Sequence, residues 1–259
     1  MTRQAHLVDP ELGPLTHDRL TADVRVWQRR KGHRFSSDDV ATAYVAWQTA
    51  PEASSFLDLG CGLGSVLLLL AWKMPGARAV GIEAQAQSFA LLQRNVAESG
   101  FSPRITIHHG DLRDEAAIAG LGSGFDLVTG TPPYFPPGHA IDAADEQRTR
   151  ARIETRGGVE AYVRTATRLV GREGAIVICG DSAADPRVLA AASLYGARVT
   201  RRCDAIPRVG RPPLFSIWTL ALGASGGTIE ESTLTLRDAV GMPADGAAAM
   251  RAFSGFPPR

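Results

Sequence analysis

The sequence predicts an α/β fold with one mainly parallel sheet, and two patterns lead to that prediction. From Ser55 onward, short apolar runs of strand length alternate with longer helical segments. A glycine-rich turn at residues 60–64 follows directly after the first of these strands. Strands separated by helices of about 10–15 residues indicate βαβ units, whose strands run parallel. The chain has 259 residues, 44% of them hydrophobic, and a formal net charge of +1, which suits a folded protein and excludes a mostly disordered one.

The part before this alternating region is less regular. Residues 1–24 are polar, contain Pro10 and Pro14, and are expected to form an irregular lead-in. Polar residues 36–39 offer helix N-cap chemistry ahead of an alanine-rich run that ends at Ala50.

Within the alternating region, helix stop signals separate the elements. Pro75 and Gly76 end the helix expected at 65–73, and Gly100 ends the helix expected at 85–99. Further helices are expected at 114–121, 159–170 and 186–194, and strands at 56–59, 78–82, 105–108, 125–129, 175–179, 198–203 and 215–221. Residues 233–236, in a tail rich in glycine, alanine and proline, fit one more strand.

Several site and location classes are excluded by composition. Cys61, Cys179 and Cys203 form no C-x-x-C pair, so neither a zinc site nor a disulfide framework is indicated, and no metal is expected. The N-terminus has no apolar signal-peptide core, and no apolar run is long enough to span a membrane. A cytoplasmic protein without membrane partners is therefore expected, as a monomer or a small homo-oligomer.

The glycine-rich turn is the most specific motif. It reads Asp58-Leu-Gly60-Cys-Gly62-Leu-Gly64 and lies between a strand and a helix. Glycines allow a tight turn and a close approach of the backbone to a ligand. Dinucleotide-binding loops usually read G-x-G-x-x-G/A and hold a pyrophosphate. The acid two residues ahead of Gly60 would repel a pyrophosphate but suits a cationic amino acid ligand.

Two further acids follow the next two strands. Glu83, followed by Ala84, closes the strand expected at 78–82, where an acid can accept both hydroxyls of a ribose. Asp111, followed by Leu112, comes after the third strand, where it can meet the edge of an adenine ring. Ligand groups at three consecutive strand ends indicate one nucleoside-containing ligand.

On these residues, the segment 55–222 resembles the class I S-adenosylmethionine-dependent methyltransferases. The resemblance implies that Asp58, Glu83, Asp111 and the three glycines bind S-adenosylmethionine. It also implies a Rossmann-like, doubly wound sheet of seven strands, mainly parallel, with the last strand antiparallel. Residues 1–54 would then be an N-terminal extension that covers the cofactor, and residues 223–259 a C-terminal strand and tail.

The loop after the fourth strand carries the expected chemistry. It reads Thr131-Pro132-Pro133-Tyr134-Phe135 and resembles the N-P-P-[YF] motif of methyltransferases that act on amino nitrogens, either adenine N6 in nucleic acids or glutamine in release factors. The resemblance implies that Thr131 and Pro132 accept hydrogen bonds from the target amino group, that Pro133 shapes the loop, and that Tyr134, with Phe135, stacks on a flat substrate. Thr131 stands where that motif has Asn; it is also a candidate cofactor contact. Its hydroxyl is shorter than an amide and is also a donor.

Segments outside the core resemble one branch, the bacterial tRNA adenine-N6 methyltransferases. Residues 30–38 resemble the K-x-G-[YF]-[RK]-F-x-x-D segment of that group, residues 151–154 its A-R-x-E segment, and residues 233–238 its late strand. By this resemblance, Phe35, Ser37 and Asp38 line the methionine end of the cofactor. Helix capping is the alternative role for Ser37 and Asp38.

Basic residues are clustered at 25–34, 148–156 and 201–211. Such clusters near a cofactor site can follow phosphates, so Arg30, Lys31 and Arg152 are candidate contacts to tRNA. A solvated, salt-bridged surface is the alternative interpretation.

Four functional hypotheses remain open from the sequence. The first is methylation of adenine N6 in RNA, with a tRNA-like substrate. The second is methylation of protein glutamine or of a small molecule. The third is a cofactor-binding partner subunit without catalysis, and the fourth is a nicotinamide-dependent dehydrogenase.

Overall fold

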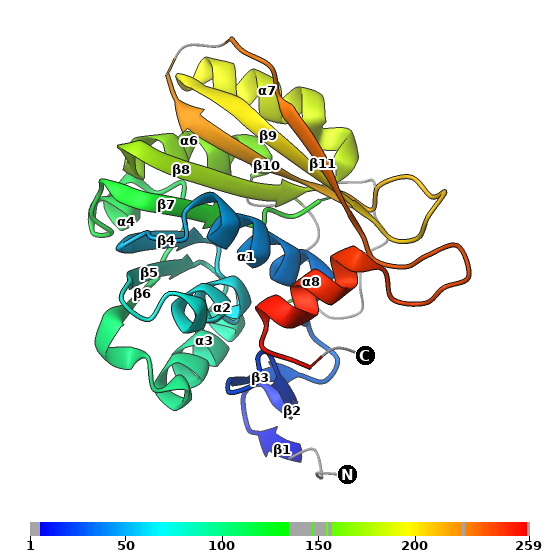
Figure 1. Ribbon diagram of the computed structural model, residues 1–259. Helices are drawn as coiled ribbons and strands as arrows, with labels where there is room; N and C mark the ends of the chain where they lie inside the picture. Colours follow the sequence, from blue (N-terminus) through cyan, green and yellow to red (C-terminus); the bar gives the residue numbers. More distant parts are fainter. Residues whose placement is uncertain (1–5, 135–146, 148–153, 155–156, 224–225, 258–259) are drawn as a thin grey trace.

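The central sheet has eight strands and contains the seven that were expected (Figure 1). This computed structural model describes residues 6–134, 147, 154, 157–223 and 226–257. The strand order is β11-β9-β10-β8-β7-β4-β5-β6. The bounds are β4 (Ser55–Leu59), β5 (Arg78–Glu83), β6 (Ile105–His109), β7 (Phe125–Gly130), β8 (Val170–Gly180), β9 (Ala197–Ile206), β10 (Phe215–Leu222) and β11 (Glu230–Thr235).

Strand β10 alone runs against its neighbours in this sheet. It pairs antiparallel with β8 and β9, and the remaining neighbouring pairs are parallel. The α/β class and the antiparallel strand at 215–221 are therefore confirmed. The further strand expected at 233–236 is found as β11, which adds to β9 at the edge of the sheet and brings the seven strands to eight.

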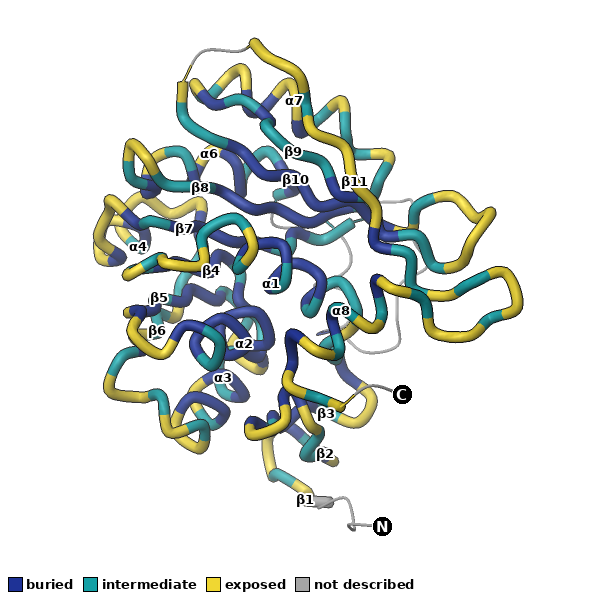
Figure 2. Tube along the Cα trace, viewed as in Figure 1, coloured by how far each residue is buried: buried dark blue, intermediate teal, exposed yellow. Residues whose placement is uncertain are grey.

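Helices cover both faces of the sheet. One face packs against α1 (Ser37–Thr49), α2 (Ser65–Lys73), α3 (Ala86–Ser99) and α8 (Asp245–Phe253). The other packs against α4 (Glu115–Ala119), α6 (Val159–Leu169) and α7 (Asp185–Leu194). Each face has its own apolar cluster, and Figure 2 shows the buried strands between them. Among the described residues, no helix is both long and apolar enough to cross a membrane.

The N-terminal region corrects one expectation. Instead of an irregular lead-in it forms a three-stranded antiparallel sheet of β1 (His6–Asp9), β2 (Gly13–Arg19) and β3 (Arg25–Arg29). Its strands are anchored to the core by Asn95 of α3, which accepts from the backbone N–H of Trp27 at 2.7 Å and donates to its carbonyl at 3.1 Å. Because the stabilising contacts come from a helix 68 positions away, the local sequence gives little sign of the strands.

The C-terminal tail also has a defined place. Its helix α8 inserts Phe253 between Tyr44 and Trp47 of α1, with ring centroids 5.6 and 5.7 Å apart. The ammonium group of Lys73 lies 4.7 Å from the Trp47 ring centroid, a cation–π distance. The tail therefore closes the outer side of α1 and α2.

Candidate active site

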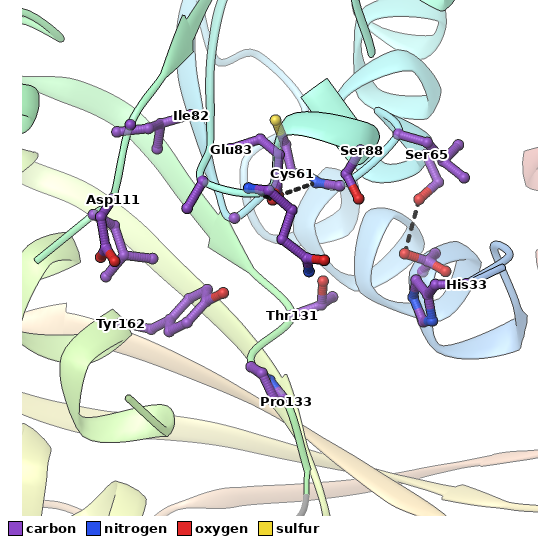
Figure 3. Close-up of a pocket in the computed structure, with 18 of the residues that line it drawn as sticks. His33, Cys61, Ser65, Ile82, Glu83, Ser88, Asp111, Thr131, Pro133 and Tyr162 are labelled. Atoms are coloured by element: carbon purple, nitrogen blue, oxygen red, sulfur yellow. Dashed lines mark hydrogen bonds between the residues drawn. The ribbon is translucent and has the colours of Figure 1, made fainter. Parts of the chain in front are cut away.

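A cleft of about 850 Å³, including its part open to solvent, lies at the carboxyl ends of β4, β5, β6 and β7 (Figure 3). Open parallel sheets bind ligands at this edge. The cleft is lined by His33, Phe35, Asp39, Gly60, Cys61, Gly62, Leu63, Ser65, Ile82, Glu83, Ala84, Gln85, Ser88, Gly110, Asp111, Leu112, Thr131, Pro133, Gly157 and Tyr162.

The three glycines of the turn do different things. All have positive φ, at +61° for Gly60, +59° for Gly62 and +95° for Gly64. A Cβ on Gly62 would meet no atom within 4 Å, so the space beside it belongs to the cleft. A Cβ on Gly64 would lie 2.8 Å from a methyl group of Leu92, inside the protein, and Gly64 does not line the cleft.

Gly60 makes room for a side chain that the sequence did not single out. A Cβ there would lie 2.2 Å from the hydroxyl oxygen of Tyr162, and a Cβ on Gly130 would lie 2.6 Å from Cδ1 of the same ring. Tyr162, on α6, is thus seated in a slot between two glycines and lines the cleft (Figure 3). Burial raises its pKa well above the usual range, so the hydroxyl stays protonated.

Glu83 is buried, lines the cleft and fixes the glycine turn. Its Oε2 accepts from the backbone N–H of Gly62 at 2.9 Å and its Oε1 from that of Gln85 at 2.6 Å. These bonds hold the carboxylate at the wall of the cleft, where its oxygens suit hydroxyl donors.

At the next strand end, Asp111 and Leu112 line the cleft, as does Ala84. The Asp111 carboxylate accepts from Arg113, from Nε at 2.9 Å and from Nη2 at 2.7 Å. Arg113 therefore compensates the charge of this carboxylate at the wall of the cleft.

Asp58 lies behind the turn and does not line the cleft. It is only 1% exposed, and its Oδ1 accepts from the hydroxyl of Thr129 at 2.8 Å. Its Oδ2 has no hydrogen-bond partner among the described residues. Burial raises the pKa of Asp58 to about 7, and the Thr129 hydrogen bond offsets only part of that effect. Asp58 therefore stands behind the turn without contacting the space of the cleft.

The N-terminal segment brings Asp39 to the cleft in place of Ser37 and Asp38. Asp39 accepts from the hydroxyl of Ser65 at 2.8 Å and from the backbone N–H of Ser36 at 2.9 Å. Burial, then the nearby charge of Asp38, raises the pKa of Asp39 to about 7. Ser36 and Asp39 have the spacing of a capping box, which can be recognised in the sequence. This motif fixes the Asp39 side chain against the backbone of Ser36. Phe35 lines the cleft as expected, and so does His33.

The loop after β7 enters the cleft with Thr131 and Pro133, whereas Pro132 is buried beside it. Tyr134 does not line the cleft. Its hydroxyl donates to Oδ2 of Asp38 at 2.8 Å and lies 3.1 Å from Sγ of Cys179. In this arrangement Tyr134 anchors the loop to α1, and the stacking role predicted for it has no support. Phe135 and Arg152 lie outside the described residues.

The lining fits a cationic nucleoside-containing ligand such as S-adenosylmethionine. It includes the carboxylates of Asp39, Glu83 and Asp111 but neither lysine nor arginine. The open space beside Gly62 admits close backbone contact. No group of three or more His, Cys, Asp or Glu side chains suited to a metal occurs in the described part of the chain. Arg30 and Lys31 are exposed and lie outside the lining.

Comparison with known proteins places these features in a family. A family model described as a methyltransferase domain matches residues 56–146. The chain is 33% identical over 204 residues to a tRNA1(Val) (adenine(37)-N6)-methyltransferase of Porphyromonas gingivalis, covering 76% of this chain and 79% of that protein. A protein of the same name from Bacteroides thetaiotaomicron is 28% identical over 211 residues, covering 81% and 85%.

Among solved structures, a predicted O-methyltransferase from Agrobacterium tumefaciens superposes with a TM-score of 0.62 at 17% identity. The match covers 86% of this chain and 99% of that one, and it shows a shared fold.

Proposed function

Because this chain belongs to the class I S-adenosylmethionine-dependent methyltransferases, we propose that it methylates the N6 amino group of an adenine in tRNA. One observation carries the proposal: Thr131 and Pro133 line the same cleft as the glycine turn, Glu83 and Asp111. This shared lining supports a cofactor and a target group meeting in one space at the carboxyl edge of the sheet.

Bound S-adenosylmethionine supplies an activated methyl group on a sulfonium sulfur. In the proposed assignment, Glu83 accepts the ribose hydroxyls, Asp111 and Leu112 contact the adenine, and the backbone around Gly62 approaches the methionine part. Asp39, in the first turn of α1, lines the cleft where a carboxylate suits the cationic end of the cofactor. Asp58 supports the turn from behind, without contact to the cofactor.

The target amino group needs orientation more than activation. The Thr131 hydroxyl and a proline carbonyl of the loop would accept its N–H bonds, which directs the nitrogen lone pair toward the methyl group. The Tyr134–Asp38 hydrogen bond holds the loop against α1. Such positioning does not require a strong base. With three free, buried cysteines and a tRNA substrate, we also propose a cytoplasmic location.

The test is methylation of unmodified tRNA with isotope-labelled cofactor, followed by mass spectrometry of the nucleosides. N6-methyladenosine in the labelled fraction is the expected product. Label found on protein glutamine, or on no RNA, would contradict the proposal.

Variants of Thr131 test the target loop. Thr131→Asn introduces the residue of the N-P-P-[YF] motif, whose longer amide side chain carries both an acceptor oxygen and an NH2 donor. The kcat of this variant is expected to rise. Thr131→Val keeps the shape but removes the acceptor, and kcat is expected to fall about tenfold, the loss of one hydrogen bond. Cofactor affinity by calorimetry is expected to change less than kcat in both. Equal kcat for the valine variant and the native chain would remove Thr131 from the mechanism.

A further inference from the structure

Two loops far apart in the sequence form one ordered unit, here called the paired loops. They are residues 207–214, between β9 and β10, and residues 236–244, between β11 and α8. The backbone N–H of Val209 donates to the carbonyl of Arg237 at 3.0 Å, and Nε of Arg208 donates to the carbonyl of Ala239 at 3.1 Å. Figure 1 shows both loops projecting together beyond the sheet.

The paired loops carry positive charge that no acid of the described part of the chain compensates. Arg208, Arg211 and Arg237 are exposed, and none of them forms an ion pair with a described residue. Nη1 of Arg237 donates to the carbonyl of Gly241 at 2.8 Å, a neutral partner. The single acid of these loops, Asp238, accepts from the backbone N–H groups of residues 240 and 242.

Arginines of the adjoining strand differ in this respect. Arg201 pairs with Glu230 at 3.1 Å, and Arg202 pairs with Asp204 at 2.9 Å. The basic cluster at 201–211 therefore divides into a neutralised half on β9 and an uncompensated half on the loop.

The same two loops also carry exposed apolar side chains. Val240 is 79% exposed and Met242 62%, with Val209 and Leu214 more than half exposed. Exposed apolar groups beside unpaired arginines mark a contact surface. Unpaired RNA segments present both sugar and base faces and phosphates, which such a surface can contact together.

The paired loops project from the same edge as the cleft. Strand β10 is antiparallel to both β9 and β8, so β9 and β8 run in the same direction. Strand β7 is parallel to β8, and β11 is parallel to β9. Their carboxyl ends therefore face the same way. At about 4.8 Å per strand, the loop after β9 starts about 14 Å from the end of β7, and the loop after β11 about 19 Å.

A second basic pair without an ion-pair partner among the described residues lies in the segment between β3 and α1. Arg30 and Lys31 are exposed, and no ion pair joins either of them to a described residue. They precede His33 and Phe35, which line the cleft. In the same segment, Arg34 is paired with Asp18 at 2.9 Å.

We propose that the paired loops bind the phosphate backbone of the RNA substrate at a distance from the target nucleotide, with Arg30 and Lys31 as a second contact beside the cleft. This inference rests on the proposed function. In the proposed function the cleft takes the cofactor and the target base, so the remaining RNA would lie across this edge of the sheet. Arginine forks bind phosphates in a bidentate manner, and the three guanidinium groups have no carboxylate to displace.

The experiment compares two variants with the native chain. The test variant is Arg208→Gln/Arg211→Gln/Arg237→Gln. The matched control is Arg201→Gln, whose arginine is already paired with Glu230. Dissociation constants for unmodified tRNA are measured from 50 to 300 mM salt, together with KM and kcat, and cofactor affinity is measured by calorimetry.

The triple variant is expected to raise the KM for tRNA at least tenfold and to lower the slope of log K against log salt by about three, about one per phosphate contact. Cofactor affinity is expected to stay within twofold. Arg201→Gln is expected to change tRNA affinity less than twofold.

The single variant Arg211→Gln keeps the test decisive if the triple variant distorts the loops. The Arg211 side chain forms no hydrogen bond with a described residue, so its replacement leaves the bonds between the loops in place. It is expected to lower the salt slope by about one. A native salt slope in Arg211→Gln and the triple variant, with RNA methylation intact, would overturn the inference and leave the proposed function standing. A native chain that methylates no RNA would instead overturn the proposed function. Altered sedimentation of the variants with unchanged tRNA affinity would identify a self-association surface and overturn the inference.

Discussion

The two halves of the carboxyl edge of the sheet are built in opposite ways. Around the cleft, the lining residues include three acids and neither lysine nor arginine among the described residues, and Glu83 and Asp39 are buried and bonded to backbone N–H groups. At the paired loops after β9 and β11 the arginines are exposed and without carboxylate partners among the described residues. A small cation needs an enclosed acidic site, whereas a polyanion needs an open basic one.

The largest expected effect tests how tightly the cleft half is packed. Gly60→Ala places a methyl group 2.2 Å from the Tyr162 hydroxyl at a φ of +61°. Gly210→Ala, in the paired loops, has a similar φ of +79° but meets nothing within 4 Å. By urea denaturation, Gly60→Ala is expected to lower the free energy of unfolding by about 3 kcal/mol and Gly210→Ala by about 1 kcal/mol.

The difference between these two variants isolates the Tyr162 contact, because both share the strain of positive φ. Adding Tyr162→Phe to Gly60→Ala removes the hydroxyl and is expected to restore part of the lost stability. Equal losses for Gly60→Ala and Gly210→Ala would contradict the slot that the two glycines form around the ring.

The next effect concerns the buried acid behind the turn. Because the pKa of Asp58 is raised in the folded chain from 3.8 to about 7, the folded state holds its proton more tightly than the unfolded state. This group therefore stabilises the fold less as pH rises through that range. Relative to the native chain, Asp58→Asn is expected to gain about 2–3 kcal/mol of unfolding free energy between pH 5 and pH 8.

Urea unfolding of both proteins at a series of pH values without cofactor measures this difference. Asn fits the site because its side-chain oxygen can accept the hydrogen bond from Thr129. Its NH2 group takes the position of Oδ2, which has no hydrogen-bond partner among the described residues. A difference that stays constant with pH would show that Asp58 is ionised throughout.

The smallest of the three effects separates the two halves by function. Glu83→Gln replaces one acceptor oxygen with an NH2 group that faces a backbone N–H. Cofactor affinity by calorimetry is expected to fall about tenfold, and the salt dependence of tRNA binding is expected to stay native. Arg211→Gln is expected to do the reverse. If both variants changed both quantities, the division of the edge into a cofactor half and an RNA half would be wrong.

Much of the core could be predicted because its signals are local. The helix expected at 65–73 is found as α2 with those bounds, and the helix expected at 85–99 as α3 from Ala86. Apolar runs and glycine stops act within a few residues, so they can be recognised without the rest of the chain. The N-terminal sheet and α8 could not, because β3 depends on Asn95 and α8 on the aromatic side chains of α1.

The amino-acid sequence by itself determined the parallel sheet, the glycine turn at its first strand end and the family to which the chain belongs. Those features follow from local patterning and short motifs. Only the tertiary structure decided that Asp39 and Tyr162 line the cleft, that Asp58 stands behind it and that Tyr134 is bound to Asp38. It also decided which arginines are paired. Such outcomes depend on which surfaces meet when distant segments pack, and a residue's neighbours in the chain do not fix them.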